Sequence, residues 1–414
     1  MFRYLPLLVP IALYLIIDIY AFQTFRTAIH SRYIHWLYWA VSFVVVSCFF
    51  YAMANDFRAW QNPYKAYISG FFIVTLIPKL ILVFFAASDD LLRVGKLLMR
   101  VFEGGSSMPA DVAGARHVPI TRSEFLSRLG LLVAAVPFGS MLWGMVRNPY
   151  NYQVSRQILH IPDLPDDLVG LSIAQISDIH TGSFAAKRPI LKAIDLLQSL
   201  KPDIVFFTGD LVNYRATEAL PYVDIFSRIT APMGVFSIMG NHDYGDYFDW
   251  NSKEERQEND RVFMEIHKKM GWQLLRNEHK ILEKNGRKIA VIGVENWSAK
   301  GFSQYGDLQK AYSGCQECQL KLLLSHDPSH WRAQVLNHYP DINATFSGHT
   351  HGMQFGVNFA GFKWSPVKYS YKEWIGLYQE SKQYLYVNPG FGFLAYPGRV
   401  GFLPEITLFT LAKA

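Results

Sequence analysis

Histidines and aspartates gather in five short clusters between residues 178 and 351 of the 414-residue chain. The clusters read SDIHTG, GD, GNHD, SHDP and SGHTHG. Imidazole and oxygen ligands suit manganese, iron or zinc, so the pattern predicts a metal site. Two divalent ions about 3.5–4 Å apart favour displacement at phosphorus, because they stabilise the attacking and the leaving oxygen together. The candidate ligands are Asp178, His180, Asp210, Asn241, His326, His349 and His351.

The spacing within the clusters indicates how these side chains reach one point. Asp178 and His180 are two residues apart, and side chains two apart point the same way from an extended segment. His349 and His351 share this spacing. Gly209 permits a tight backbone turn before the aspartate that follows it. The alternative, a polar loop network without metal, requires all these clusters to coincide by chance.

The elements before the clusters must position them. Longer helical patterns occur at Arg188–Leu200, Glu218–Ile229 and Lys253–Met270. Alternating strands and helices favour an α/β domain with parallel pairing, in which functional groups gather at the carboxyl ends of the strands. All five clusters follow a predicted strand directly. The predicted strands are Leu171–Ile176, Ile204–Thr208, Val235–Met239, Lys288–Val294, Leu320–Leu324, Ala344–Phe346, Tyr384–Val387 and Ile406–Leu411.

In this order and spacing, D-x-H, GD, GNHD, a lone histidine and GHTH resemble the calcineurin-like metallophosphoesterase family over about residues 171–411. The tail, with VNPGFG, Arg399 and PEITL, is similar to the membrane-anchored bacterial branch of that family. The resemblance implies a four-layer αββα sandwich at residues 150–414, preceded by a bundle of four transmembrane helices at residues 1–149. It also implies hydrolysis of a phosphate ester or pyrophosphate by a metal-bridging hydroxide.

The resemblance assigns a role to each motif residue. Asp178, His180 and His351 would bind one metal, and Asn241, His326 and His349 the second, with Asp210 bridging them. His242 would donate a hydrogen bond or proton to the substrate, Asp243 would orient that histidine or its loop, and Arg399 would reach a substrate phosphate or form a surface ion pair. Asn213 stands where many relatives carry an acid that supports the histidine, which weakens the proton-donor prediction.

Four apolar stretches are long enough to cross a bilayer, which takes about 20 helical residues. They are Leu5–Phe22, Ile34–Ala54, Ala66–Ala87 and Leu129–Val146. The pattern from Leu91 to Phe102 predicts an interfacial amphipathic helix, and residues 104–119 a flexible connector. Two charges, Asp18 and Lys79, fall within spans, where they could mark a pathway. The alternatives are that Asp18 snorkels from a position near a helix end and that Lys79, next to Pro78, contacts another helix or the interface.

Basic residues in the short loops predict the orientation, because cytoplasmic loops carry the excess. Eight lie on one side of the spans and three on the other, which places the catalytic domain outside the cytoplasm, on a bacterial inner membrane. The eight are Arg26, Arg32, Arg93, Lys96, Arg100, Arg116, Arg122 and Arg128, and the three are Arg3, Arg58 and Lys65.

Charge and cysteine content restrict the partners. Residues 151–414 carry 27 basic and 27 acidic side chains, so nucleic-acid binding is not expected, and the expected partners are the bilayer and a phosphorylated small molecule or lipid. Three cysteines are too few for a disulfide framework. Cys315 and Cys318 form a CxxC that lacks the second pair a structural zinc site needs, and they are expected to be loop cysteines able to pair in an oxidising compartment. The sequence does not determine the oligomeric state.

Several functions stay open at this stage. A relative in the same branch cleaves the pyrophosphate of a UDP-linked diacylglucosamine, and a non-catalytic phosphate-binding receptor or a transporter with an accessory domain are further alternatives. The loops 214–220, 244–259 and 361–378 hold many aromatic residues. These aromatics would either admit an acyl chain or exclude water from the metal site.

Overall fold

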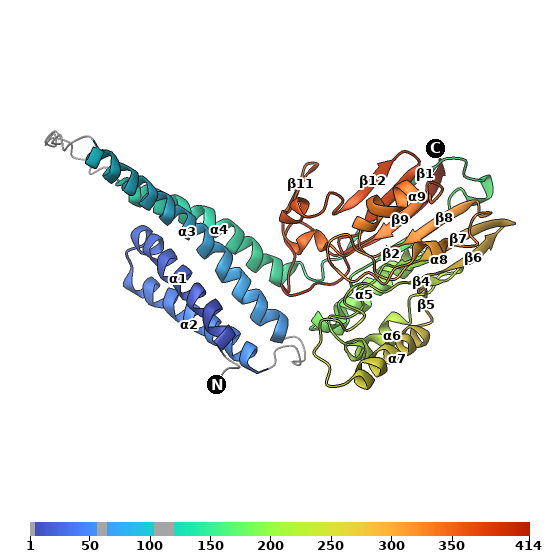
Figure 1. The fold of residues 1–414 in the computed structure, drawn as a ribbon, viewed down its shortest axis with the longest axis horizontal. Helices are drawn as coiled ribbons and strands as arrows, with labels where there is room; N and C mark the ends of the chain where they lie inside the picture. Colours follow the sequence, from blue (N-terminus) through green and yellow to red (C-terminus); the bar gives the residue numbers. More distant parts are fainter. Residues whose placement is uncertain (1–4, 56–63, 103–119) are drawn as a thin grey trace. The chain divides into compact units, whose positions relative to one another are not determined.

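A computed structural model describes residues 5–55, 64–102 and 120–414, and the chain divides into two compact units (Figure 1). The first comprises Met1–Trp60 and Tyr67–Trp143, and the second Gln61–Ala66 and Gly144–Ala414. The connector at 104–119 and the predicted loop charges Arg3, Arg58 and Arg116 lie outside the described residues.

The first unit contains four helices that are long and apolar enough to cross a membrane. They are α1 (Leu5–Ala28), α2 (Arg32–Ala54), α3 (Tyr64–Phe102) and α4 (Arg122–Arg147). Each contains one predicted span. The amphipathic stretch that begins at Leu91 is the continuation of α3, not a separate helix, because no glycine or proline interrupts its start.

The two charges within the spans contact each other inside the bundle. Lys79 Nζ lies 2.8 Å from Asp18 Oδ1, and both side chains are buried. Lys79 also donates to Tyr14 at 2.9 Å and to Ser42 at 2.7 Å, while Tyr38 donates to Asp18 Oδ1 at 2.6 Å. These residues come from α1, α2 and α3, so the charges form a contact between helices, as one of the alternatives for Lys79 predicted.

The second unit is built on two six-stranded sheets. In each sheet the central strands are parallel, as predicted, whereas the pairs β14–β2, β12–β13 and β6–β7 are antiparallel. The first sheet has the order β1 (Gln153–Ile161), β14 (Glu405–Lys413), β2 (Ser172–Ile176), β3 (Ile204–Phe207), β4 (Val235–Ser237) and β5 (Gln273–Leu274). The second has the order β12 (Gly376–Glu380), β13 (Gln383–Val387), β9 (Ala344–Ser347), β8 (Leu320–Leu324), β7 (Arg287–Gly293) and β6 (Glu278–Lys284).

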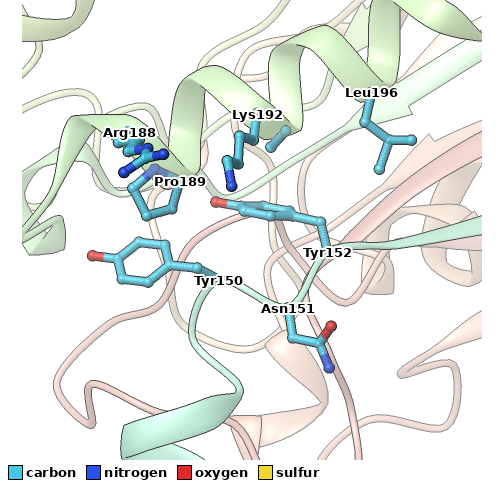
Figure 2. Close-up of a pocket in the computed structure, with 8 residues that line it drawn as sticks. Tyr150, Asn151, Tyr152, Arg188, Pro189, Lys192 and Leu196 are labelled. Carbon is cyan, nitrogen blue, oxygen red and sulfur yellow. The ribbon is translucent and has the colours of Figure 1, made fainter.

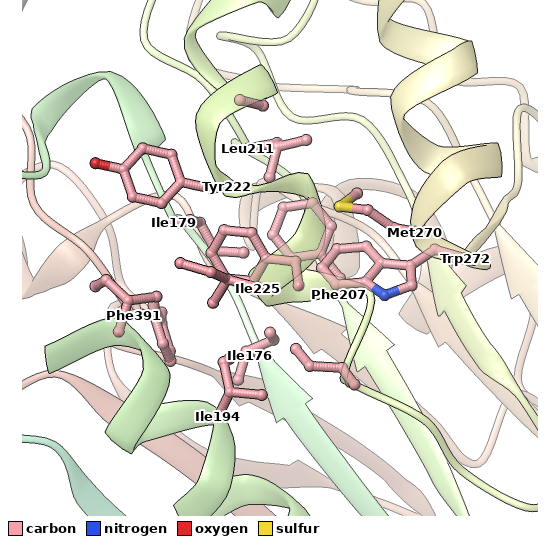
Figure 3. Close-up of a cluster of buried hydrophobic side chains, with 14 of the residues drawn as sticks. Ile176, Ile179, Ile194, Phe207, Leu211, Tyr222, Ile225, Met270, Trp272 and Phe391 are labelled. Carbon is pink, nitrogen blue, oxygen red and sulfur yellow. The ribbon is translucent and has the colours of Figure 1, made fainter. Parts of the chain in front are cut away.

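Three apolar clusters define four layers. The first lies between the sheets and includes Phe206 and Phe346. Burial of each of these side chains stabilises the fold by roughly 1.5–3 kcal/mol. The second packs α5 (Lys187–Ser199), α6 (Val223–Phe226) and α7 (Lys253–Met270) against the first sheet, around Phe207 and Trp272 (Figure 3). The third packs α8 (Leu308–Tyr312) and the turn at Trp331–Val335 against the second sheet. The domain is therefore the predicted αββα sandwich.

Local signals explain which elements were predicted well. Helix α7 has the predicted bounds, because Ser252 Oγ accepts a hydrogen bond from the Glu255 amide at 3.1 Å and Gly271 ends the helix with φ of 75°. The predicted helix Glu218–Ile229 is wrong as one element. It is divided into 3₁₀ turns at Ala216–Glu218 and Leu220–Tyr222 and the short α6, and Pro221 accounts for the break.

Candidate metal centre

The seven predicted ligands lie at the carboxyl ends of strands from both sheets. Asp178 and His180 follow β2, Asp210 follows β3 and Asn241 follows β4 of the first sheet. His326 follows β8, and His349 and His351 follow β9, of the second sheet. Because the two sheets pack face to face, these loops meet along one edge of the sandwich.

The first group of ligands consists of Asp178, His180 and His351, whose donor atoms all lie within 4.8 Å of one another. The Nε2 atoms of the two histidines are 3.0 Å apart, and His351 Nε2 is 3.2 Å from Asp178 Oδ1. Three buried donor atoms thus converge on one position. A divalent cation is the group that such a set of nitrogen and oxygen atoms binds.

The second group is Asp210, His326 and His349, again with donor atoms within 4.8 Å of one another. Asn241 joins it, because its Oδ1 atom is 2.8 Å from His349 Nδ1. Asp210 Oδ2 lies 3.2 Å from His326 Nε2 and 3.6 Å from His180 Nε2. This carboxylate therefore stands between the two groups, where a bridging ligand belongs.

The protonation states also fit metal binding. Burial favours the neutral carboxyl groups, but His351 holds the pKa of Asp178, and His326 that of Asp210, below the ordinary value. Burial lowers the pKa of His180 to about 3, so its imidazole is neutral. His326 is the exception: burial opposes its charge, yet Asp210, 3.2 Å away, raises its pKa to about 10, so the ring must release a proton before its Nε2 atom can bind a metal.

The backbone of the ligand loops is not extended, contrary to the expectation for the D-x-H and HTH spacings. Left-handed φ angles occur at Asp178 (51°), His180 (50°), Asp210 (61°), His349 (71°) and His351 (51°). Side chains two apart therefore converge because each ligand adopts a left-handed turn. Such residues cost of order 1–3 kcal/mol and cluster at functional sites, where the surrounding structure enforces them.

Glycines allow the loops to approach closely. At Gly209, which has φ of 95°, a Cβ atom would lie 2.5 Å from the Gly240 amide nitrogen and 2.8 Å from His326 Nδ1. At Gly348 a Cβ atom would overlap the carboxylate of Asp178. The His349 amide donates to that carboxylate at 3.0 Å. Larger residues at either glycine would force the two groups of ligands apart.

Asp243 binds backbone amides. Its carboxylate accepts hydrogen bonds from Asp210 at 2.8 Å, Leu211 at 2.8 Å, Val212 at 3.2 Å and Gly240 at 2.9 Å. The side chain is almost fully buried. In this position Asp243 joins the loop after β3 to the loop after β4. It thereby positions Asp210, the aspartate that both ligand groups share.

His242 is held at the edge of the ligand groups. Its amide donates to Asp210 Oδ1 at 2.9 Å, and its Nδ1 atom is 2.8 Å from the carbonyl oxygen of Asn213. The ring lies 5.0 Å from that of His180 and 4.6 Å from that of Tyr247. The backbone of Asn213 thus supports the imidazole where many relatives use an acidic side chain.

Arg399 is fully buried, so the surface ion pair is excluded. Its guanidinium donates to the carbonyl oxygens of Pro389 at 2.7 Å, Gly390 at 3.2 Å and Gly392. Its Nη2 atom is 3.4 Å from His351 Nδ1. The arginine therefore fastens the VNPGFG loop beside a ligand, and its hydrogen-bonding atoms face protein groups.

Sequence analysis assigned no role to two residues that contact His349. The Tyr371 hydroxyl is 2.9 Å from His349 Nε2 and donates to Asp327 Oδ2 at 3.2 Å. Asp327 Oδ2 is itself 3.6 Å from His349 Nε2. Partners of this kind orient a ligating imidazole. Asp327 could have been found from the sequence because it directly follows His326. Tyr371 could have been found because it lies in a loop rich in aromatic residues.

A separate hollow of about 550 Å³ lies beside the first turn of α5 (Figure 2). Tyr150, Tyr152, Arg188 and Lys192 line it, and no predicted ligand belongs to its described lining. The two groups of ligands therefore lie outside this hollow.

The sandwich, the two ligand groups and the shared carboxylate define the class of dinuclear metallophosphoesterases. Residues 171–353 match the calcineurin-like phosphoesterase family, and residues 3–149 match a family described as a probable calcineurin-like phosphoesterase transmembrane domain. The chain belongs to the calcineurin-like phosphoesterases and is a metal-dependent phosphoric ester hydrolase with four candidate membrane spans.

Related proteins match the chain over different lengths. A transmembrane protein with metallophosphoesterase domain from Danio rerio is 28% identical over 332 residues, covering 78% of this chain and 68% of the relative. The uncharacterized metallophosphoesterase YkuE from Bacillus subtilis is 28% identical over 301 residues, covering 70% and 98%. The UDP-2,3-diacylglucosamine pyrophosphatase LpxG from Chlamydia trachomatis is 26% identical over 304 residues, covering 63% and 89%. Similarity therefore extends to animals as well as bacteria.

Proposed function

We propose that the chain hydrolyses a phosphate ester or pyrophosphate at a membrane, using two divalent ions held by the seven predicted ligands. The observation that carries this proposal is the convergence of two buried ligand groups on the shared Asp210. A bound pair of manganese, iron or zinc ions would supply an activated water and neutralise charge on the phosphoryl oxygens. Elemental analysis of the purified protein would identify the metal.

His242 is proposed as the residue that donates a hydrogen bond or proton to the substrate. The carbonyl oxygen of Asn213 accepts from its Nδ1 atom, which orients the ring and turns Nε2 to the substrate; Nε2 donates only when the ring is an imidazolium with a proton on both nitrogens. Asp243 and Arg399 are proposed to position the loops around the site, because their polar atoms bind backbone groups. In this role Asp243 and Arg399 affect turnover only through the residues that they hold.

The test is hydrolysis of a panel of aryl phosphate monoesters and diesters by the purified chain with added manganese. His242→Ala should lower kcat by about 10²–10⁴-fold, the usual contribution of a positioned proton donor, with metal content unchanged. His338→Ala, which removes an exposed histidine, is the matched control. Absence of both bound metal and hydrolysis would refute the proposal, and full biological activity of His242→Ala would favour the non-catalytic receptor.

The second candidate is cleavage of a lipid-linked UDP-diacylglucosamine pyrophosphate, which the similarity to LpxG favours. This reaction requires a nucleotide diphosphate diester. Preference for UDP-diacylglucosamine over aryl phosphates by at least about 10³-fold in kcat/KM would support it, since that ratio corresponds to roughly 4 kcal/mol of transition-state binding. Equal rates on both would reject it.

We further propose that the catalytic domain lies outside the cytoplasm of a bacterial inner membrane. The count of basic residues in the loops on each side of the spans supports this orientation. Adding Arg147 at the end of α4 raises the smaller count only from three to four, against eight on the other side. A membrane-impermeant maleimide should label Glu283→Cys, an exposed position, in intact cells, and the parent chain is the control. Labelling only after lysis would reverse the orientation and permit the cytoplasmic UDP-diacylglucosamine reaction.

A further inference from the structure

A small hairpin stands apart from the two large sheets of the domain. Its strands are β10 (Val357–Phe359) and β11 (Phe362–Trp364), and β11 is labelled in Figure 1. They are antiparallel and joined by Ala360 and Gly361, with φ of 49° and 84°. Two consecutive positive φ angles form the tight turn that suits a two-residue hairpin. The register of the pair therefore determines which side chains share a face.

The hairpin has one apolar and one polar face. Phe359 pairs with Phe362 and Val357 with Trp364, and paired residues in an antiparallel ladder lie on the same side. The other side carries the pair of Asn358 and Lys363. A half-buried sheet normally turns its apolar side to the core and its polar side to water.

In this hairpin three residues of the apolar face are exposed. Phe359 is 78% exposed, Phe362 62% and Val357 46%, whereas Trp364 is half-buried. Asn358 and Lys363 are exposed as well and line a hollow of about 590 Å³ on the domain, together with polar residues such as Gln153 and Glu405. The domain therefore leaves the apolar side uncovered at the tip of the hairpin.

Nearby residues extend the apolar face. Tyr369 is 76% exposed, and Met353 is exposed as well. Among the described residues that follow α4, Phe359, Tyr369 and Phe362 are the three most exposed large apolar residues. Lys368 adds a positive charge next to them. Exposed apolar patches of this kind mark sites of contact with a partner or a membrane.

The base of the hairpin is bonded to the loops that hold the metal ligands. Ser365 Oγ donates to the carbonyl oxygen of Gly352, the residue after His351, at 2.9 Å. The Gly356 amide donates to the carbonyl oxygen of Val400, the residue after Arg399, at 3.0 Å. The base of the hairpin therefore lies within a few residues of His351 in the sequence, and a molecule that binds to the hairpin is held by the same part of the chain.

We propose that this apolar face, formed by Val357, Phe359, Phe362 and Trp364 with Met353 and Tyr369, contacts the lipid bilayer and presents the metal centre to phosphate groups carried by lipids. The chain itself brings the bilayer into reach, because it has four helices able to span one. Aromatic residues beside lysine are typical of the membrane interface, where the rings enter the headgroup layer and the cation attracts anionic lipids. The substrate class rests on the proposed phosphoesterase function, whereas the bilayer contact does not.

The contact is tested on the full chain in phosphatidylcholine vesicles that contain phosphatidic acid. A fluorescent label on Ala360→Cys, in a chain carrying Cys48→Ser, should be quenched by lipids with a nitroxide near the headgroup. The same label on Glu283→Cys, an exposed position in β6, should not be quenched. Equal quenching at the two sites, or crosslinking of the tip to a second copy or to the chain's own helices, would overturn the proposal.

Activity tests the substrate class separately. Phe359→Ser combined with Phe362→Ser should raise KM for vesicle-borne phosphatidic acid by about tenfold or more, since each phenylalanine loses its apolar contact with the lipid. Hydrolysis of a soluble aryl phosphate should be unchanged. Ile158→Ser with Leu220→Ser, which removes exposed apolar residues elsewhere, is the matched control. An equal loss of activity on both substrates would reject the role of the hairpin in presenting lipids. Quenching of the label at Ala360→Cys, without hydrolysis of either substrate by the parent chain, would reject only the proposed function.

Discussion

The helical bundle and the sandwich each bury a cluster of ionisable side chains, and the two clusters differ in how their charges are balanced. In the bundle one cation, Lys79, meets one anion, Asp18, and the three N–H groups of the lysine are directed at three oxygens. In the sandwich, imidazole nitrogens of His180 and His351 face each other at 3.0 Å, and His180 and His326 both lie beside one oxygen of Asp210.

This difference separates a structural cluster from a binding site. A buried ion pair whose two charges balance holds helices together and leaves little for a ligand to add, even though Asp18 Oδ2 has no hydrogen-bond partner. Lone pairs that converge without donors are unfavourable until a cation arrives, so their persistence indicates a binding function. Three changes test this comparison.

The largest effect is expected at Asp210, which lies between the two ligand groups. Asp210→Asn should remove bound metal and lower kcat/KM by more than about 10³-fold, because groups that only support a ligand already contribute 10–100-fold. Metal content and hydrolysis of an aryl phosphate provide the measurement. Asp224→Asn, at an exposed aspartate of α6, is the control, and retention of two metals by the Asp210 variant would contradict its bridging position.

A smaller effect is expected in the bundle. Lys79→Met leaves Asp18 buried without its counter-charge, which should lower the free energy of unfolding in detergent by about 3–5 kcal/mol. The double variant Lys79→Met with Asp18→Asn should recover most of that loss, and hydrolysis per folded molecule should not change. A pathway role predicts the reverse, with stability retained and activity altered.

A third buried group has neither a counter-charge nor converging ligands. Burial lowers the pKa of His267 to about 4, whereas unfolding returns it to about 6.5. The unfolded chain therefore binds the extra proton first, and stability falls as the pH drops from about 6.5 to about 4. At pH 5 the loss from this residue is about 2 kcal/mol. His267→Leu should remove that part of the acid sensitivity in denaturant unfolding at pH 7.5 and pH 5, and an unchanged pH dependence would contradict it.

The sequence predicted the central strands well, and the side chains that it predicted as ligands lie close together; both the strands and the ligand motifs are local patterns. Buried strands such as Leu320–Leu324 are continuous apolar runs, and each is followed by a polar cluster. Edge strands were missed because they are half exposed; β6 reads EHKILEK and carries no clear apolar signal. The partners of Asp243 and Arg399 were also beyond the sequence, since they are backbone atoms of other loops.

By itself, the order of residue types determined which side chains are proposed to bind metal and which segments are apolar enough to enter a membrane. Ligand chemistry and hydropathy are properties of single side chains and short windows, so they can be read before folding. Only the tertiary structure decided that Asp18 meets Lys79, that the ligands converge through left-handed turns, and that the apolar side of the hairpin at Val357–Trp364 is uncovered at its tip. Each of these depends on packing between distant segments, which no local pattern encodes.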